Sequence, residues 1–286
     1  MNLHQTKELL ARHHLAPHKR LGQNFLVHSH TAQRIVDLAG LNPEDTVVEV
    51  GVGLGALTRP LSGVAARVIG VEADSGIIRL HEELQDLPEN VRLVHADILK
   101  LNLAELCQDG ARLKIVANLP YSISSPFLFH LIEHREHLHS AVIMLQKELG
   151  LRLSAQPGSK VYGAPTVLLA ACADVEALLE VGPTEFHPQP QVDSLVLRLS
   201  FYPEPARLKP LGDFNRSLFN RIVRAAFAQR RKALLNALRP LEADKKRLAT
   251  QLKNAGIAPA ARAETLTLAD FIRLSQVMAA DTVVGQ

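Results

Sequence analysis

Cysteine is scarce in this sequence. Its two examples, Cys107 and Cys172, lie in unrelated segments and lack the spacing of metal ligands. We therefore expect no disulfide framework and no zinc or other metal site. Both residues are interpreted as thiols of the protein core.

Long apolar runs are also missing. No run approaches the ~20 residues that cross a bilayer, and the first residues, MNLHQTKELLARHH, lack the apolar stretch of a secretory signal. The 286 residues are 47% apolar and 21% charged, which is the balance of a soluble globular protein with a large core. We therefore expect a cytoplasmic, monomeric protein with no membrane partner.

Acidic side chains are absent from two stretches. Residues 9–36 hold four Arg and Lys side chains and residues 214–240 hold seven, with no Asp or Glu in either. Because the net charge of the chain is only +3, the remainder is acidic. Two basic segments on an acidic body suggest a polyanionic partner, although a solvated cationic helix face is the alternative. The candidate nucleic-acid-binding residues are Arg221, Arg224, Arg230, Arg231 and Lys232.

From residue 46 onward, short apolar runs alternate with amphipathic stretches such as 75–84 and 125–135. Five runs are rich in β-branched residues and do not alternate, which is typical of buried parallel strands. They are 46–50, 67–72, 91–95, 113–117 and 141–145. The runs 175–181 and 194–201 are predicted to form an antiparallel hairpin at the sheet edge. The pattern predicts an α/β fold with a seven-stranded sheet.

Prolines mark the end of this pattern. They cluster in the stretch YPEPARLKPLGD, after which amphipathic patterns such as FNRIVRAAF replace the strand-like runs. The sequence therefore predicts two domains. A larger α/β domain covers residues 1–205, and a small all-helical domain covers residues 206–286.

A glycine-rich turn, EVGVGLGA (49–56), follows the first predicted strand. Gly51 and Gly53 let the backbone turn sharply and let a ligand lie against it, because glycine has no Cβ. Read loosely, the pattern fits a dinucleotide-binding turn, and Glu72 at the end of the next strand is placed to accept from ribose hydroxyls. A nicotinamide-dependent reductase is therefore one interpretation.

Two carboxylates favour S-adenosylmethionine instead. Glu49 puts negative charge beside the crevice, which disfavours a pyrophosphate and suits a ligand that carries an ammonium and a sulfonium. Asp97, after the third strand, offers an acceptor for an adenine amino group, and its alternative role is that of a helix N-cap. At successive strand ends, Gly51, Glu72 and Asp97 predict a nucleoside crevice at the switch point of the sheet.

The fourth strand runs into Asn118-Leu119-Pro120-Tyr121. The exocyclic amine of adenine is a poor nucleophile because its lone pair is delocalised into the ring. If the Asn118 side-chain oxygen and the Leu119 carbonyl accept its two N–H bonds, the lone pair points at a methyl donor. Pro120 would fix the backbone, and Tyr121 would stack on the base. These four are the candidate catalytic residues, and loop closure by ordinary turn residues is the alternative.

A second aromatic side chain, Phe186, lies in a loop that two prolines stiffen. It is a candidate to cover the other face of the base, and equally a candidate to plug the end of the sheet. Stacking on an aromatic ring is worth ~1 to 3 kcal/mol per base, comparable to the cost of extruding a nucleotide. Tyr121 alone would therefore offset much of that cost.

Together these motifs resemble those of the ribosomal RNA adenine N6-dimethyltransferase family, over nearly the whole chain from about residue 18. The resemblance is closest to the bacterial small-subunit members, and six such segments in order make it strong. The most specific segments are KRLGQNFL (19–26), EVGVGLGALT (49–58), ANLPYSIS (117–124), PGSKVYG (157–163), FHPQPQVDS (186–194) and AAFAQRRKALLNAL (225–238).

The resemblance implies a Rossmann-like methyltransferase sheet with a helical domain that contacts RNA and the ribosome. It implies an enzyme that uses S-adenosylmethionine to dimethylate two adjacent adenosines near the 3′ end of small-subunit (16S) ribosomal RNA. The substrate would be a partly assembled ribosomal particle. The segment GQNFL is expected to fold back over the donor, whose implied contacts are Asn24, Leu26, Gly51, Glu72, Asp97 and Asn118.

The chain departs from the family at several positions. Val52 stands where many members have Pro, which bears on the rigidity of the glycine-rich turn. Gly150 and Leu151 stand where the family usually has Ala-Glu. These changes bear on particle contacts or packing more than on methyl transfer.

Two rival functions stay open. The related antibiotic-resistance methylase of large-subunit RNA shares the NLPY segment, and the long basic stretch 225–238 favours the small-subunit enzyme over it. A ribosome-assembly or RNA-binding factor that keeps the fold but not the chemistry is the other. Intact Glu72, Asp97, Asn118 and Tyr121 speak against this factor.

Overall fold

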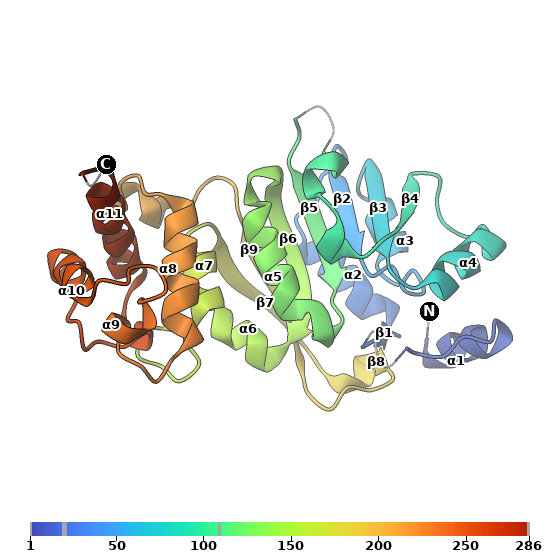
Figure 1. The fold of residues 1–286 in the computed structure, drawn as a ribbon. Helices are drawn as coiled ribbons and strands as arrows, with labels where there is room; N and C mark the ends of the chain where they lie inside the picture. The colour runs from blue at the N-terminus through green and yellow to red at the C-terminus, as the bar shows by residue number, and fades with distance from the viewer. Residues whose placement is uncertain (1, 19–21, 108–109, 285–286) are drawn as a thin grey trace. The chain divides into compact units, whose positions relative to one another are not determined.

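The chain divides into two compact units in a computed structural model that describes residues 2–18, 22–107 and 110–284. The first unit comprises Met1–Gly150 and Asp174–Pro203, and the second comprises Leu151–Ala173 and Glu204–Gln286. Figure 1 shows a central sheet in the first unit and a group of helices in the second.

The first unit is built on a seven-stranded sheet with the order β4-β3-β2-β5-β6-β9-β7 (Figure 1). The strands from β4 to β6 are parallel, and β9 runs antiparallel to both of its neighbours. Each run predicted as a strand coincides with one of these strands, so the predicted α/β fold is confirmed. The strands are β2 (Thr46–Val50), β3 (Arg67–Glu72), β4 (Val91–His95), β5 (Leu113–Asn118), β6 (Leu138–Gln146), β7 (Asp174–Val181) and β9 (Ser194–Ser200).

The central strands are apolar throughout because they lie inside the unit. Val47 and Val48 of β2 and Val116 of β5 have no measurable exposure, as expected for parallel strands that are covered on both faces. The helices of this unit also bury one apolar stripe each, as α4 does with Ile77 and Leu80. They are α1 (Leu3–Arg12), α2 (Ser29–Leu38), α3 (Thr58–Ser62), α4 (Ser75–Leu84) and α5 (Ser124–Glu133).

The strand order reverses at β2, which pairs with β3 on one side and β5 on the other. In open α/β sheets, ligands bind in the crevice beyond the carboxyl ends of the strands at such a switch point. Glu72 and Asn118 end two of these three strands, and Glu49 is the penultimate residue of the third. The topology therefore gathers the predicted site residues at one edge.

A separate two-stranded sheet pairs β1 (Phe25–Leu26) with β8 (Phe186–His187). It joins the N-terminal segment to the loop between β7 and β9, and the Val27 N–H extends it by donating to the Glu185 carbonyl at 2.9 Å. The sequence did not predict this pair, because two-residue strands have no periodicity to detect.

The second unit is helical. Its core contains Phe219 and Ile222 of α8 and Phe271 of α11, all at most 1% exposed. Across the described residues, none of the helices combines the length and apolar character that crossing a membrane requires. The helices are α7 (Ala164–Ala170), α8 (Arg216–Ala228), α9 (Leu234–Ala237), α10 (Lys245–Asn254) and α11 (Leu268–Val284), and α6 (Lys147–Leu153) enters the unit at residue 151.

Residues 151–173 belong to the second unit, although the sequence placed them in a domain spanning 1–205. Their polar groups bond to the C-terminal part of the chain. The Tyr162 hydroxyl donates to the Leu266 carbonyl at 2.9 Å, and the Gly158 N–H donates to the Glu264 carbonyl at 2.7 Å. These long-range contacts give no local sequence signal, so a single boundary near residue 205 misses them.

Candidate active site

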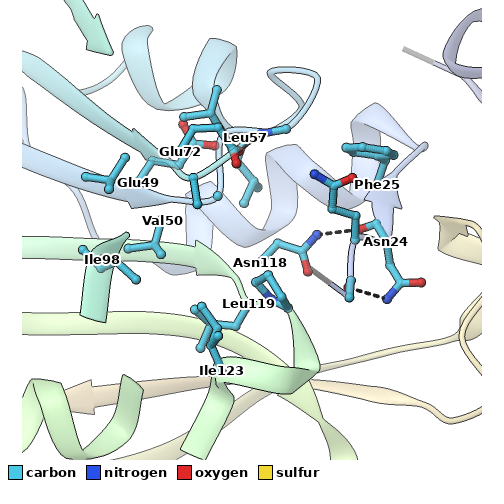
Figure 2. Close-up of a pocket in the computed structure, with 18 of the residues that line it drawn as sticks. Asn24, Phe25, Glu49, Val50, Leu57, Glu72, Ile98, Asn118, Leu119 and Ile123 are labelled. Carbon is cyan, nitrogen blue, oxygen red and sulfur yellow. Dashed lines mark hydrogen bonds between the residues drawn. The ribbon is translucent and has the colours of Figure 1, made fainter. Parts of the chain in front are cut away.

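A cavity of about 260 Å³ opens at the carboxyl ends of β2, β3 and β5 (Figure 2). The turns after these strands line it, together with η2 (Ile98–Lys100), η4 (Tyr121–Ile123) and residues 22–26. All of the predicted catalytic and donor-binding residues except Phe186 line this cavity. They are Asn24, Leu26, Gly51, Gly53, Glu72, Asp97, Asn118, Leu119, Pro120 and Tyr121.

The glycine-rich turn needs its glycines for conformation and for close contact. Gly51 and Gly53 have φ values of 78° and 51°, a region that residues with a Cβ rarely adopt. A Cβ on Gly53 would also lie 3.2 Å from the Phe25 ring. Val52 between them is 3% exposed, so its side chain is packed against the rest of the unit.

Glu72 is held in place by the backbone. Its two oxygens accept the Gly53 N–H at 3.0 Å and the Asp74 N–H at 2.9 Å. Burial raises its pKa, while these two hydrogen bonds act in the opposite direction. Because a carboxylate has about four lone-pair sites, each oxygen keeps capacity for a further donor such as a ribose hydroxyl.

Glu49 lines the same cavity with both carboxylate oxygens lacking a hydrogen-bond partner among the described residues. The residue has no exposed surface. Burial is the main reason why the pKa of Glu49 is raised to about 8, and the nearby Glu72 raises it further. The Thr58 hydroxyl acts in the opposite direction, although the geometry between the two side chains falls short of a hydrogen bond. A buried carboxyl without partners is costly to keep. Its position indicates a place for a cationic group of a ligand.

Asp97 is the N-cap of η2, where its side chain accepts the Leu99 N–H at 3.0 Å. The structure therefore contains the capping role that was the alternative interpretation of this residue. Asp97 also lines the cavity, next to Ile98. Its side chain is 43% exposed, and the oxygen that does not cap the helix, Oδ2, lies 3.9 Å from the Lys100 ammonium.

Asn118 has a fixed orientation at the end of β5. Its Nδ2 donates to the Asn24 carbonyl oxygen at 3.0 Å (Figure 2). A carbonyl oxygen cannot face another carbonyl oxygen across a hydrogen bond, so this contact determines which end of the amide is the nitrogen. The Oδ1 atom is therefore left as an acceptor at the cavity.

The residues after Asn118 are anchored to the sheet. The Leu119 N–H donates to the Met144 carbonyl of β6 at 3.1 Å. The Tyr121 hydroxyl lies 3.0 Å from Ser194 Oγ at the start of β9, and burial raises the Tyr121 pKa, with Ser194 acting in the opposite direction. The ring of Tyr121 is thereby held at the cavity by a residue of the FHPQPQVDS segment.

The N-terminal segment reaches the cavity through residues 22–26. The Asn24 side chain donates to the Gly22 carbonyl at 3.2 Å while its own carbonyl holds Asn118. Leu26 is 4% exposed and pairs with Phe186. Residues 19–21, the start of the KRLGQNFL segment, lie outside the described residues.

Phe186 does not line the cavity. It is 2% exposed and packs in the apolar core with Leu26 and Met144. It pairs with Leu26 in the small sheet, and both residues belong to the same apolar core cluster. The location matches the interpretation in which Phe186 plugs the end of the sheet, and a role in covering the base stays a prediction.

The candidate RNA-binding residues lie in the second unit and are not among the residues that line the cavity described above. Arg221 and Arg224 are on α8, and Arg230, Arg231 and Lys232 are in the turn before α9; all five are exposed. The basic stretch is thus not one continuous helix, because α8 ends at Ala228.

Arg230 differs from its neighbours because it makes contacts within the unit. Its guanidinium donates to the carbonyls of Lys160 and Tyr162, both at 3.0 Å, and lies 3.7 Å from a carboxylate oxygen of Glu264. These contacts hold the PGSKVYG segment. The sequence alone could not separate this role from RNA binding, since both need only a positive charge.

The apolar lining of the cavity was not identified from the sequence. It includes Phe25, Val50, Leu57, Ile98 and Ile123, all labelled in Figure 2. These are ordinary core-type residues, and their only signal is a position beside a motif residue. Gln23 was missed as well; its amide donates to Asp74 at 2.8 Å.

A model of the ribosomal RNA adenine dimethylase family matches residues 15–280 of the chain. The chain is 46% identical over 284 residues to the ribosomal RNA small subunit methyltransferase A of Desulfotalea psychrophila, covering 96% of this chain and 95% of the relative. It is 43% identical over 267 residues to the protein of the same description from Geobacter metallireducens, covering 92% and 95%.

Two solved structures have a similar fold. A dimethyladenosine transferase from Plasmodium falciparum superposes with a TM-score of 0.73 at 25% identity, covering 90% of this chain and 98% of that one. The 23S rRNA methyltransferase ErmE superposes with a TM-score of 0.62, also at 25% identity, covering 90% and 100%.

Proposed function

Because the chain belongs to the ribosomal RNA adenine dimethylase family, we propose that it transfers methyl groups to the N6 amines of adenosines in small-subunit ribosomal RNA. The curated relatives described above carry the small-subunit name. The observation that carries the chemistry is the Asn118 amide, whose nitrogen is held by Asn24 and whose oxygen is left as an acceptor at the cavity.

The residues at the cavity fit S-adenosylmethionine as the methyl donor. Glu49 is a buried carboxyl group whose oxygens lack partners among the described residues, and its raised pKa keeps it protonated near neutral pH until a cation such as the ammonium group lies beside it. Glu72 has capacity for ribose hydroxyls. Asp97 has an oxygen for the adenine amine. A dinucleotide fits less well, because its pyrophosphate would lie beside two carboxylates. When bound, S-adenosylmethionine supplies a methyl group that is activated by a sulfonium.

Asn118 then acts on the target base. Its Oδ1 and the Leu119 carbonyl accept the two N–H bonds of the adenine amine, which draws the nitrogen out of conjugation and aims its lone pair. The contact from Nδ2 to Asn24 means that this orientation exists before the base arrives, so little reorganisation is needed. No strong base is required, because the amine proton becomes acidic once the nitrogen is alkylated.

Tyr121 supports the base by stacking. Its hydroxyl contact with Ser194 limits the ring to one position, so less side-chain entropy is lost when the base binds. Stacking is worth ~1 to 3 kcal/mol per base, against a few kcal/mol for extruding a nucleotide. This contribution favours an adenosine that is already unpaired.

The substrate we propose is two adjacent adenosines near the 3′ end of the RNA in a partly assembled small-subunit particle. Exposed cations on α8 and in the turn after it would contact the RNA backbone, with Arg221 and Arg231 as the main candidates. We also propose a monomer that acts in the cytoplasm. Neither of the two cysteines, both of which are among the described residues, forms a disulfide, as reducing compartments favour.

The test is to mix the protein with S-adenosylmethionine and small-subunit particles that lack the modification. Mass spectrometry of RNA digests should detect dimethyladenosine only when protein and donor are both present. Large-subunit particles that lack methylation serve as the matched substrate and should stay unmodified. Dimethyladenosine in large-subunit RNA alone would support the resistance-type methylase, and particle binding without any methylation would support a non-catalytic assembly factor.

A further inference from the structure

The backbone of Gly53 is held at both its N–H and its carbonyl oxygen. On one side its N–H donates to Glu72 Oε2 at 3.0 Å. On the other, its carbonyl oxygen lies 2.8 Å from Nε2 of His81, a residue of α4 whose side chain is 2% exposed. His81 is not part of any motif in the sequence, yet it contacts the turn on which the proposed donor site is built.

The second ring nitrogen of His81 also faces an acceptor. Nδ1 lies 2.9 Å from Asp86 Oδ1, just beyond the C-terminal end of α4. Arg59 of α3 binds the other Asp86 oxygen at 2.5 Å and the Asp86 carbonyl at 2.8 Å. Burial works against the ionised form of Asp86, but His81 and Arg59 outweigh it and lower its pKa. Asp86 is therefore a carboxylate that can only accept.

These two contacts need a proton on each ring nitrogen. A carboxylate and a peptide carbonyl are both acceptors, so each must face an N–H. A neutral ring has one N–H, and its bare nitrogen would then face an oxygen at under 3 Å, lone pair against lone pair. Loss of a proton must therefore break one of the two contacts. Because the Asp86 carboxylate is the stronger acceptor, the neutral ring keeps its N–H on Asp86 and loses the contact to Gly53.

We propose that His81 is a positioning residue that holds the glycine-rich turn through its doubly protonated ring, so that binding of the methyl donor weakens when the ring loses a proton. The proposal rests on the proposed function of the cavity. It gives the enzyme a pH response that acts on donor binding through a side chain that does not line the cavity.

Other charged groups around His81 bear on this response. Asp86, which is paired with Arg59, faces the ring, and Glu72 accepts the Gly53 N–H. On the outer surface of α4, His13 lies 3.4 Å from Glu83. Glu49, with its pKa of about 8, gains charge as pH rises and should strengthen the binding of an ammonium group. The two effects have opposite signs, so an experiment must separate them.

The variant Asp86→Asn separates the effect of His81 from that of Glu49. An asparagine can accept from Arg59 with its oxygen and donate its N–H to Nδ1, so a neutral ring can keep its Nε2–H on Gly53. Binding of S-adenosylhomocysteine is measured by calorimetry across a pH series for the wild type and this variant. We expect the wild type to weaken by about tenfold relative to Asp86→Asn as the ring loses its proton, the size of one charge-assisted hydrogen bond. If the ratio of the wild-type donor affinity to that of Asp86→Asn is constant with pH, the proposal is overturned.

Nitrogen NMR of the ring gives an independent readout that needs no donor. In the wild type at the acidic end of the series, both nitrogens of His81 should carry protons. One bare nitrogen there would overturn the proposal, even if the variants were to misfold. His81→Gln should reduce donor affinity and its pH dependence, whereas His4→Gln, at a histidine whose side chain is 89% exposed, should change neither. If no variant and no wild type binds the donor at any pH, the proposed function itself fails, and the NMR result remains as a property of the fold.

Discussion

The cavity of the first unit and the basic stretch of the second differ in how much of their polar capacity is already used. At the cavity, Asn118 and Glu72 are oriented by backbone contacts and still have oxygen atoms to offer. In the basic stretch, Arg230 donates to two carbonyls, and Arg216 donates to the Ala171 carbonyl and pairs with Glu204. These two arginines serve the fold, although in the sequence they look like their neighbours.

The difference shows that a motif and a charge count carry different information. A motif such as NLPY fixes residue types whose geometry is set by neighbours in the chain and by the strand that precedes them. A charge count only bounds the number of cations that can reach a phosphate. Predictions about the cavity therefore concern single residues, while predictions about the basic stretch must first separate structural from available cations.

Asn118→Ala should have the largest effect. It removes the oriented acceptor, and the methylation rate should fall by about a hundredfold to a thousandfold, as is usual when one preorganised hydrogen-bonding group is lost. Particle binding, measured by filter retention, should be largely kept. Asn118→Asp is the matched variant. It keeps an acceptor but loses the N–H on Asn24, so its rate should lie between those of the wild type and Asn118→Ala. Equal loss in both variants would show that the Asn24 contact matters more than the acceptor.

Glu49→Gln should weaken donor binding and stabilise the fold at the same time. Loss of the charge that suits an ammonium should reduce donor affinity by about tenfold to a hundredfold. Glu49 has a raised pKa in the folded state, about 8 against 4.5, so between these values the folded state keeps a proton that the unfolded state has lost. The stability of the wild type should therefore fall as pH rises through this window, by about 1.4 kcal/mol per pH unit from this group.

Urea unfolding at pH 5 and pH 8 measures this effect. The stability gain of Glu49→Gln should be larger at pH 8 than at pH 5, because glutamine has no proton to keep. Parallel pH profiles for the two proteins would mean that the pKa of Glu49 is not raised in the folded state.

Arg230 and Arg231 form a pair that sharpens the comparison directly, because they are adjacent and carry the same charge. Arg231→Ala should lower the salt slope of particle binding by about 1, as for one lost phosphate contact. Arg230→Ala should instead cost about 1 kcal/mol of stability in the helical unit through its hydrogen bonds to Lys160 and Tyr162. Particle binding at several salt concentrations, with thermal unfolding, separates the two. A reversed pattern would mean that Arg230 is the RNA contact.

Tyr121→Phe should have the smallest effect. It keeps the ring for stacking and removes only the hydroxyl contact with Ser194, so the methylation rate should fall by a few-fold at most, about the value of one net hydrogen bond. Tyr121→Ala is the comparison, since it removes the stacking surface worth ~1 to 3 kcal/mol. If the two variants were equally impaired, stacking would not be the role of this residue.

The sequence predicted the sheet well and the placement of some side chains poorly, for physical reasons. A buried parallel strand such as β2 is a continuous β-branched run, which is a local signal, and the switch point follows from the strand order. The assignment of residues 151–173 to the second unit depends on contacts such as that of Tyr162 with Leu266, which are remote in sequence. The same is true of Phe186, whose place in the core beside Leu26 depends on a pairing between segments that are remote in sequence.

The residues missed at the site share one property. Each contacts a partner that is far away in the sequence: His81 bonds to the glycine-rich turn, and Gln23 bonds to Asp74. Glu49 could be identified from the motif, but its lack of partners could not, because that depends on what the fold places around it.

A structure of the protein with S-adenosylhomocysteine and an RNA fragment that presents the target adenosine tests the central claim most directly. We expect the adenine N6 within about 3 Å of both Asn118 Oδ1 and the Leu119 carbonyl oxygen, with Asn118 Nδ2 still on the Asn24 carbonyl. An adenine bound elsewhere, or an Asn118 oxygen turned away from N6, would contradict the account.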